Sequence, residues 1–167
     1  MSELSFSPAS SEDTPILLDI LTDATHQKLN RGDMSWGPSG WTEEEVRDVM
    51  TESTVYLVRQ NDQIIGTVSL QWDDEEVWGP QPPVAGYLHR LAIKDEFRGQ
   101  GLGEQIVDWS AARAAENGRS SLRLDCEESN EDLCNYYKGL GFTKVGSQIL
   151  NEFYTAALFE RPTNIDN

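Results

Sequence analysis

Hydrophobic positions in the first fifty residues follow two periods, one typical of a strand and one typical of helices. Residues 4–6 alternate hydrophobic and polar side chains, which predicts a short first strand. From about residue 11 to residue 29 the hydrophobic positions recur at helical spacing, and this predicts a helix. Thr42 and Glu45 have the spacing of a capping box, so a second helix is expected to begin there and to end near residue 51.

The rest of the chain is dominated by hydrophobic runs that are typical of strands. Two such runs, on either side of Asn61 and Asp62, predict a hairpin of antiparallel strands. A strand over 84–93, a helix over 101–117 and a strand over 121–126 then form a unit whose two strands are expected to be parallel. The last predicted elements are a helix over 131–140 and two strands over 142–147 and 153–158.

Length and composition are typical of one globular domain. The chain has 167 residues, 38% of them hydrophobic, and we expect a single domain over residues 1–167 with its core in 54–159 and frayed ends. The formal net charge of −16, from 13 Lys and Arg against 29 Asp and Glu, argues against nucleic acid as a partner. No hydrophobic run suits a membrane span and the first residues do not resemble a signal peptide, so we expect a cytoplasmic protein without a membrane partner.

A glycine-rich turn between a predicted strand and a predicted helix is the strongest candidate for a binding site. The turn consists of Arg98, Gly99, Gln100, Gly101, Leu102 and Gly103. The first amides of a helix have no intrahelical partner, and their partial positive charge attracts anions. The three glycines remove Cβ atoms and permit positive φ angles, while the guanidinium of Arg98 can bind phosphate oxygens. The turn therefore predicts a seat for phosphate groups.

Spacing separates this turn from two other phosphate-binding motifs. A dinucleotide-binding fingerprint needs a glycine or alanine where this chain has Glu104, and few residues remain after Asp125 for further strand and helix units. A P-loop needs a Gly-Lys-Ser/Thr sequence, which is absent from the chain. A dinucleotide-dependent redox protein is thus a poorly supported alternative.

Two motifs together resemble those of the GCN5-related N-acetyltransferase (GNAT) superfamily. The spacing of Arg98, Gly101 and Gly103 resembles the family's acyl-CoA pyrophosphate loop. Downstream, Asn130 opens a predicted helix that ends in the sequence Tyr-Tyr-Lys-Gly-Leu-Gly-Phe at residues 136–142, which resembles a second signature of the family. The resemblance covers about residues 54–159, and the two helices before the sheet suit the same family.

The resemblance implies an α/β fold of the α+β type. Its sheet is expected to be mixed but largely antiparallel, with about six to seven strands and about four flanking helices. The fourth and fifth strands are expected to splay apart in a V, so that the pantetheine arm of coenzyme A enters the gap between them.

The same resemblance assigns residues of this chain to the binding of acetyl-CoA, the expected acyl donor. Leu91 and Ile93 are expected to offer main-chain groups to the acyl carbonyl and the pantetheine amides, and the amides of residues 98–103 to bind the pyrophosphate. Asn130 either orders the wall around the pantetheine or only caps its helix. No metal ion is expected to take part.

Tyr137 corresponds to the family's general acid. An acid is needed because collapse of the tetrahedral intermediate expels a thiolate, and a phenol remains protonated at neutral pH. Packing alone is the alternative role for Tyr137, and Tyr136 is expected to be its buried neighbour.

The general base is harder to assign from the sequence. Many relatives place a glutamate on the strand before the glycine turn, but the corresponding residue here is Tyr87, which we keep as a candidate substrate contact. His89 lies two residues further along and shares a face with Tyr87 if the strand is regular, so its imidazole is a candidate proton acceptor or water relay. A purely structural histidine is the alternative. Arg90 is expected on the opposite face, in an ion pair.

Aromatic and acidic residues mark the expected acceptor side. Trp36 and Trp72 lie in segments that often border the acceptor pocket in this fold class, and Trp72 precedes the acidic run 73–76. Asp125 follows a strand. It either binds a water molecule or the acceptor ammonium, or it simply lies at a solvated strand end. Aromatic rings near carboxylates favour a cationic ligand, whereas core packing is the commoner use of Trp.

These features together predict an N-acetyltransferase that moves an acetyl group from acetyl-CoA to a primary amine, which attacks the thioester directly in a ternary complex. The acceptor is expected to be a small molecule rather than a protein, and the enzyme a monomer or a homodimer. A catalytically idle acyl-CoA-binding or regulatory module of the same fold is the alternative.

Overall fold

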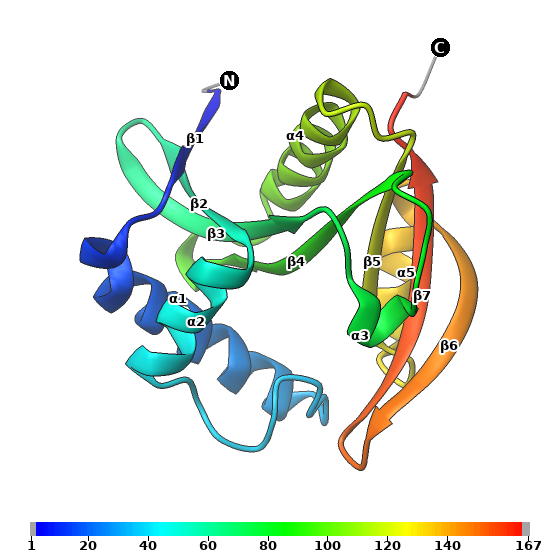
Figure 1. Cartoon of the computed structure of the whole chain (residues 1–167). Coiled ribbons are helices and arrows are strands. Elements are labelled where there is room, and N and C mark those ends of the chain that lie inside the picture. Colours follow the sequence, from blue (N-terminus) through cyan, green and yellow to red (C-terminus); the bar gives the residue numbers. More distant parts are fainter. Residues whose placement is uncertain (1–2, 165–167) are drawn as a thin grey trace.

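Seven strands form one mixed sheet in the computed structural model, which describes residues 3–164 (Figure 1). The strands lie in the order β1-β2-β3-β4-β5-β7-β6, and every neighbouring pair is antiparallel except β4 and β5. The expected mixed and largely antiparallel sheet is confirmed. The strand bounds are β1 Leu4–Pro8, β2 Thr54–Gln60, β3 Gln63–Gln71, β4 Ala85–Ile93, β5 Ser121–Glu127, β6 Thr143–Asn151 and β7 Tyr154–Pro162.

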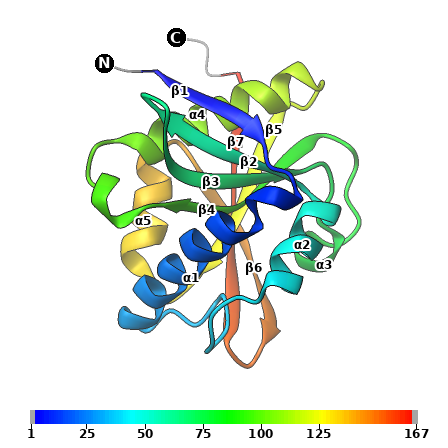
Figure 2. The ribbon, with the colours of Figure 1, turned by 90° about the vertical axis from the view of Figure 1, so that its left-hand side faces the viewer.

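Helices cover both faces of this sheet (Figures 1 and 2). Hydrophobic side chains of α1 and α2 pack on one face, and those of α4 and α5 pack on the other. Within residues 3–164, no helix combines the length and the hydrophobicity that crossing a bilayer requires. The helix bounds are α1 Thr14–Asn30, α2 Glu43–Glu52, α3 Glu75–Trp78, α4 Leu102–Glu116 and α5 Glu131–Gly139.

The bounds of three elements differ from the sequence prediction. Helix α1 begins at Thr14 rather than near residue 11, because Ser10 and Asp13 form a capping box around a 3₁₀ turn. The last two strands extend further than their hydrophobic pattern predicted. Most side chains of β6 are exposed at the edge of the sheet, so the strand has no buried face to mark its length.

Strands β4 and β5 pair only at one end and then separate. Their parallel register runs from Ala85 opposite Ser121 to Tyr87 opposite Arg123. Beyond that point β4 continues to Ile93 and β5 to Glu127 without pairing with each other. The separation leaves main-chain groups of both strands unpaired along the gap. The expected V between the fourth and fifth strands is confirmed.

A bulge interrupts β4 beside this gap. Arg90 has a left-handed backbone with φ of 52°, and Arg90 and Leu91 together face the single residue Val68 of β3. Gly66 of β3 makes the bulge possible, because a Cβ there would collide with the main-chain oxygen of Ala92. Because the bulge breaks the two-residue alternation of the strand, sequence reasoning about which faces its side chains occupy fails here.

Candidate functional site

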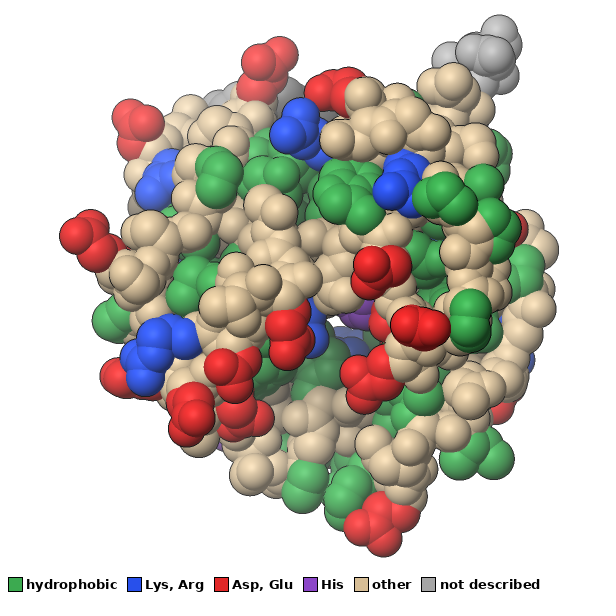
Figure 3. All heavy atoms as spheres, in the orientation of Figure 1, with side chains coloured by type: hydrophobic (Ala, Val, Ile, Leu, Met, Phe, Trp, Pro, Cys, Tyr) green, Lys and Arg blue, Asp and Glu red, His purple; other side chains and the backbone are tan. Residues whose placement is uncertain are grey.

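A cavity of about 1100 Å³ opens where β4 and β5 separate. Figure 3 shows a hollow near the centre of the view. Its walls are β4 from Leu88 to Ile93, β5 from Leu124 to Cys126, and residues of α1, α5 and the segment after α1. Asp and Glu side chains gather around the hollow, and basic and His side chains are visible within it (Figure 3). A cavity of this size can hold two substrates at once.

The glycine-rich turn lies at the N-terminus of α4, at one end of the cavity. Gly99 and Gly101 have φ angles of 79° and 74°, which a residue with a Cβ adopts only with strain. The amides of residues 99–103 donate to no acceptor within the described part of the chain, so they are available to an anion. Gly103 is different, because it is helical and a Cβ there would collide with the Tyr136 hydroxyl. The expectation of a positive φ angle at Gly103 was therefore wrong.

Arg98 and Ile93 meet at the rim of the cavity. The Nε group of Arg98 donates to the main-chain oxygen of Ile93 at 3.1 Å. The guanidinium lies 3.6 Å from a carboxylate oxygen of Asp95 and 3.9 Å from one of Asp23. Arg98 is thus held in place at the start of the turn, and its side chain remains one-third exposed.

Tyr137 lines the cavity from α5 and is almost completely buried. Its exposed fraction is 8%, and its ring packs against Phe142 and Phe159 at centroid distances of 5.8 and 6.4 Å. Burial raises the pKa of the phenol above its ordinary value, so the hydroxyl is protonated at neutral pH. Tyr136 is 42% exposed, so the expectation that it is the buried neighbour was wrong. Helix α5 turns Tyr137, not Tyr136, toward the core.

Asn130 joins two segments at the edge of the cavity. Its Oδ1 accepts from the amide of Leu133 at 3.2 Å and caps α5, while its Nδ2 donates to Asp33 at 2.9 Å. Burial raises the pKa of Asp33, but Lys28 and the hydrogen bonds from Asn130 and Ser35 outweigh it and lower that pKa below its usual value. Asn130 therefore caps the helix and also anchors the segment after α1. Sequence reasoning missed the role of Asp33.

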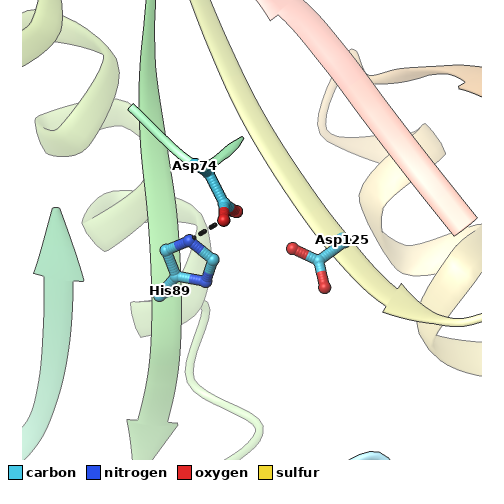
Figure 4. A group of neighbouring side chains, drawn as sticks. All are labelled: Asp74, His89 and Asp125. Carbon is cyan, nitrogen blue, oxygen red and sulfur yellow. Dashed lines mark ion pairs between the residues drawn. The ribbon is translucent and has the colours of Figure 1, made fainter. Parts of the chain in front are cut away.

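His89, Asp74 and Asp125 form a cluster inside the cavity (Figure 4). The Nε2 atom of His89 lies 3.0 Å from an oxygen of Asp74, in an ion-pair contact whose angle does not make a hydrogen bond. One ligand atom from each of the three residues lies within 4.8 Å of the others. Buried atoms Asp74 Oδ2, His89 Nε2 and Asp125 Oδ1 have no hydrogen-bond partner among the described residues.

The buried position of Asp125 affects its charge. Burial raises the pKa of this carboxyl, and the opposing effects of His89 and of the Tyr154 hydroxyl do not cancel it. The Tyr154 hydroxyl donates to one carboxylate oxygen of Asp125 and leaves the other free. A cation placed among these atoms would find three acceptors and would favour the ionised form of Asp125. The cluster has the spacing for either one ammonium group or a divalent metal ion.

Arg90 also lines the cavity, contrary to the expected opposite face and ion pair. No carboxylate of residues 3–164 lies within 4 Å of its guanidinium, which lies over the Trp41 ring at 5.9 Å. The bulge at Arg90 turns its side chain to the cavity.

The expected aromatic contacts divide into two groups. Trp36 lines the cavity, with Lys28 5.0 Å above its ring and Trp41 5.9 Å away in an edge-to-face arrangement. Trp72 lies outside the cavity lining, beneath the Arg119 guanidinium at 5.6 Å. Tyr87 is 2% exposed, and its hydroxyl accepts from Arg123 at 2.9 Å, so it too lies outside the lining. The structure does not bring Trp72 and Tyr87 to the cavity.

Leu91, Ile93, Asp125 and Asn130 all line the cavity, together with His89 and Tyr137. The sequence pointed to the acidic run 73–76 but not to the one carboxylate in it that faces His89. Asp74 precedes the short helix α3, which turns this side chain inward while Asp73, Glu75 and Glu76 remain exposed. No sequence signal distinguishes Asp74 from its acidic neighbours.

Comparisons with known proteins agree with this fold. The model of the acetyltransferase (GNAT) family matches residues 17–142. The chain is 25% identical over 148 residues to the uncharacterised N-acetyltransferase YesJ of Bacillus subtilis, covering 84% of this chain and 82% of that protein.

Among solved structures, the aminoglycoside acetyltransferase AAC(6′)-Ib in a complex that includes acetyl-CoA superposes with a TM-score of 0.77 at 17% identity, covering 96% of this chain and 93% of that one. A GNAT-family acetyltransferase from Listeria monocytogenes has a TM-score of 0.76 at 22% identity, covering 96% and 95%.

Proposed function

The chain belongs to the acetyltransferase (GNAT) family, and on that premise we propose that it transfers the acetyl group of acetyl-CoA to a small primary amine in a ternary complex. One observation carries the proposal. The gap between β4 and β5 opens onto a cavity that contains a buried, protonated phenol and a cluster of three unpartnered polar atoms. These are the groups that an amine and a thioester need in order to react.

The donor is proposed to enter along the separated strands. The free amides of residues 99–103 bind the pyrophosphate, and Arg98 adds a positive charge at the same end. Main-chain groups of Leu91 and Ile93 bind the acyl carbonyl and the pantetheine amides, and Asn130 orders the opposite wall through its bond to Asp33. Binding of coenzyme A derivatives by solved relatives of the same fold supports this arrangement.

The amine is proposed to enter the cavity as an ammonium and to bind at the cluster of His89, Asp74 and Asp125. Its three N–H groups match the three unpartnered acceptor atoms. The Nε2 atom of His89 takes one proton, and the nearby carboxylate of Asp74 stabilises the positive charge that forms on the imidazole. The neutral amine nitrogen then attacks the carbonyl carbon of the thioester, and main-chain amides of β4 bind the developing oxyanion.

Collapse of the tetrahedral intermediate breaks the carbon–sulfur bond. Tyr137 gives its hydroxyl proton to the departing sulfur, so that coenzyme A leaves as a thiol, and the amide product loses its second N–H proton to the phenolate or to solvent. Holding both substrates in one cavity supplies most of the acceleration, because it converts a bimolecular reaction into one between fixed neighbours. Trp36 forms part of the wall around the acceptor.

The test is thiol release from acetyl-CoA over a panel of small amines, with calorimetry of acetyl-CoA binding in parallel. We expect binding together with amine-dependent thiol release. Binding without release for any amine would indicate the idle acyl-CoA-binding module, and no binding at millimolar acetyl-CoA would refute the proposal.

A further inference from the structure

Tyr136 lines the cavity, but the acetyl transfer described above gives it no role. Its side chain is 42% exposed, and its ring packs edge-to-face against the ring of Tyr137 at a centroid distance of 5.4 Å. A phenylalanine would make the same ring contact, so packing does not account for the hydroxyl.

The hydroxyl of Tyr136 reaches from α5 to the first turn of α4. A Cβ added to Gly103 would collide with this oxygen, so the hydroxyl and the glycine lie against each other. The side chain of Ile93, at the end of β4, lies 3.7 Å from the same Cβ position. All three residues line the cavity. The missing Cβ of Gly103 therefore leaves the space that the Tyr136 hydroxyl occupies.

This contact places a free hydrogen-bond donor beside the proposed phosphate seat. Gly103 contributes one of the free amides of residues 99–103. The Tyr136 hydroxyl, unlike those of Tyr87 and Tyr154, makes no hydrogen bond within residues 3–164. A hydroxyl at the N-terminus of a helix can donate to a bound anion together with the helix amides.

The phenol of Tyr136 retains its proton at neutral pH. Burial, and after it the negative charge of Glu104, raise its pKa above the ordinary value. We infer that Tyr136 is a binding residue for the acyl donor, and that its hydroxyl donates a hydrogen bond to the pyrophosphate of acetyl-CoA beside the amide of Gly103. The inference rests on the proposed function, because it concerns the donor of the same reaction.

Replacing Tyr136 by Phe removes the hydroxyl and keeps the ring contact with Tyr137. The KM for acetyl-CoA and the Kd for coenzyme A are expected to rise by roughly tenfold, as for the loss of a hydrogen bond to a charged and partly exposed group. The kcat at saturating acetyl-CoA should change by less than about twofold, because the lost bond is the same in the ground state and the transition state.

Truncated donors locate the contact on the donor molecule. Acetyl-dephospho-CoA lacks the 3′-phosphate but keeps the pyrophosphate, whereas S-acetylpantetheine has no phosphate. We expect Tyr136→Phe to lower kcat/KM by the same roughly tenfold factor for acetyl-CoA and acetyl-dephospho-CoA, and to leave kcat/KM for S-acetylpantetheine unchanged. An equal loss with all three donors would overturn the inference, because the hydroxyl would then act on the pantetheine arm or through packing. A loss with acetyl-CoA alone would also overturn it, since the 3′-phosphate would be the partner.

A second variant tests the same contact from α4. The Cβ of Gly103→Ala would displace the Tyr136 hydroxyl, so this substitution is expected to weaken coenzyme A binding about as much as Tyr136→Phe does. In the double variant the losses should not add. Losses that add would overturn the inference, because the two substitutions would then act on the donor independently. Tyr56→Phe is the control, since it removes a tyrosine hydroxyl outside the cavity lining and should leave all three donors unaffected.

Calorimetry of coenzyme A binding supplies a readout that does not depend on turnover. If the wild type and Tyr136→Phe bind coenzyme A equally well, the inference is overturned and the acetyl transfer itself stands. Failure of the proposed function looks different, because the wild type would then bind no coenzyme A at millimolar concentration, which would refute this inference as well.

Discussion

Replacing Tyr137 by Phe separates the catalytic role of the phenol from its role in packing. The hydroxyl of Tyr137 donates to no acceptor in residues 3–164, so its removal leaves no buried partner unsatisfied. The ring contacts with Phe142 and Phe159 persist in the variant. The free energy of unfolding should therefore change by less than about 0.5 kcal/mol.

The chemical step should respond much more strongly. Without an acid the sulfur must leave as a thiolate, and kcat is expected to fall by about tenfold to several hundredfold, which corresponds to a barrier higher by about 1.4 to 3.5 kcal/mol. The affinity for acetyl-CoA should change little. Because burial raises the pKa of Tyr137, the acid stays protonated in mildly basic solution, and kcat in the wild type should show no loss from this group below about pH 10.

The assay is continuous detection of free thiol under saturating substrates, with calorimetry for acetyl-CoA binding and urea denaturation for stability. Tyr56→Phe is a matched control, since Tyr56 is 7% exposed, is as buried as Tyr137 and lies outside the cavity lining. Unchanged kcat in Tyr137→Phe would refute the acid assignment. A fall in kcat accompanied by a comparable loss in the free energy of unfolding would instead indicate a packing role for Tyr137.

Three further outcomes are expected. His89→Gln should lower kcat/KM for the amine by roughly a hundredfold near neutral pH, and activity should partly recover as rising pH deprotonates the amine in solution. If the variant keeps the acidic limb of the wild-type pH profile, His89 is excluded as the base. Gly66→Ala should reduce the free energy of unfolding by about 2 kcal/mol or more, because the added Cβ would meet the rigid main chain of Ala92. Gly146→Ala is the control and should cost much less, since a Cβ there makes only an ordinary contact with Leu158. Equal denaturation midpoints for the two variants would contradict this account of the bulge. A chelator should leave the rate unchanged, and inhibition by the chelator would refute the proposed ammonium site. Added Zn²⁺ should raise the apparent KM for the amine but not for acetyl-CoA, because the ion would bind the three atoms of the buried cluster.

The sequence alone predicted the fold class, through the family resemblance, and it predicted most of the elements and the conformation of the glycine turn directly. The elements and the turn depend on local properties: the period of hydrophobic residues, the capping residues, and the glycines that let the turn at Gly99 and Gly101 adopt positive φ angles. A short motif also pointed to Tyr137, which lines the cavity. The sequence did not predict that Tyr137 is buried and Tyr136 exposed, because the rotation of α5 about its axis depends on how the helix packs against the sheet.

The acceptor side was decided by the tertiary structure. The bulge at Arg90 exists because Gly66, on a neighbouring strand, leaves room for the main chain of Ala92, and it turns Arg90 into the cavity against the alternation of the strand. His89 and Asp125 face each other from β4 and β5, and Asp74, which directly precedes α3, joins them from a third segment of the chain (Figure 4). Contacts of this kind join residues that are far apart in the chain. The sequence around each residue therefore does not indicate which distant residues it contacts.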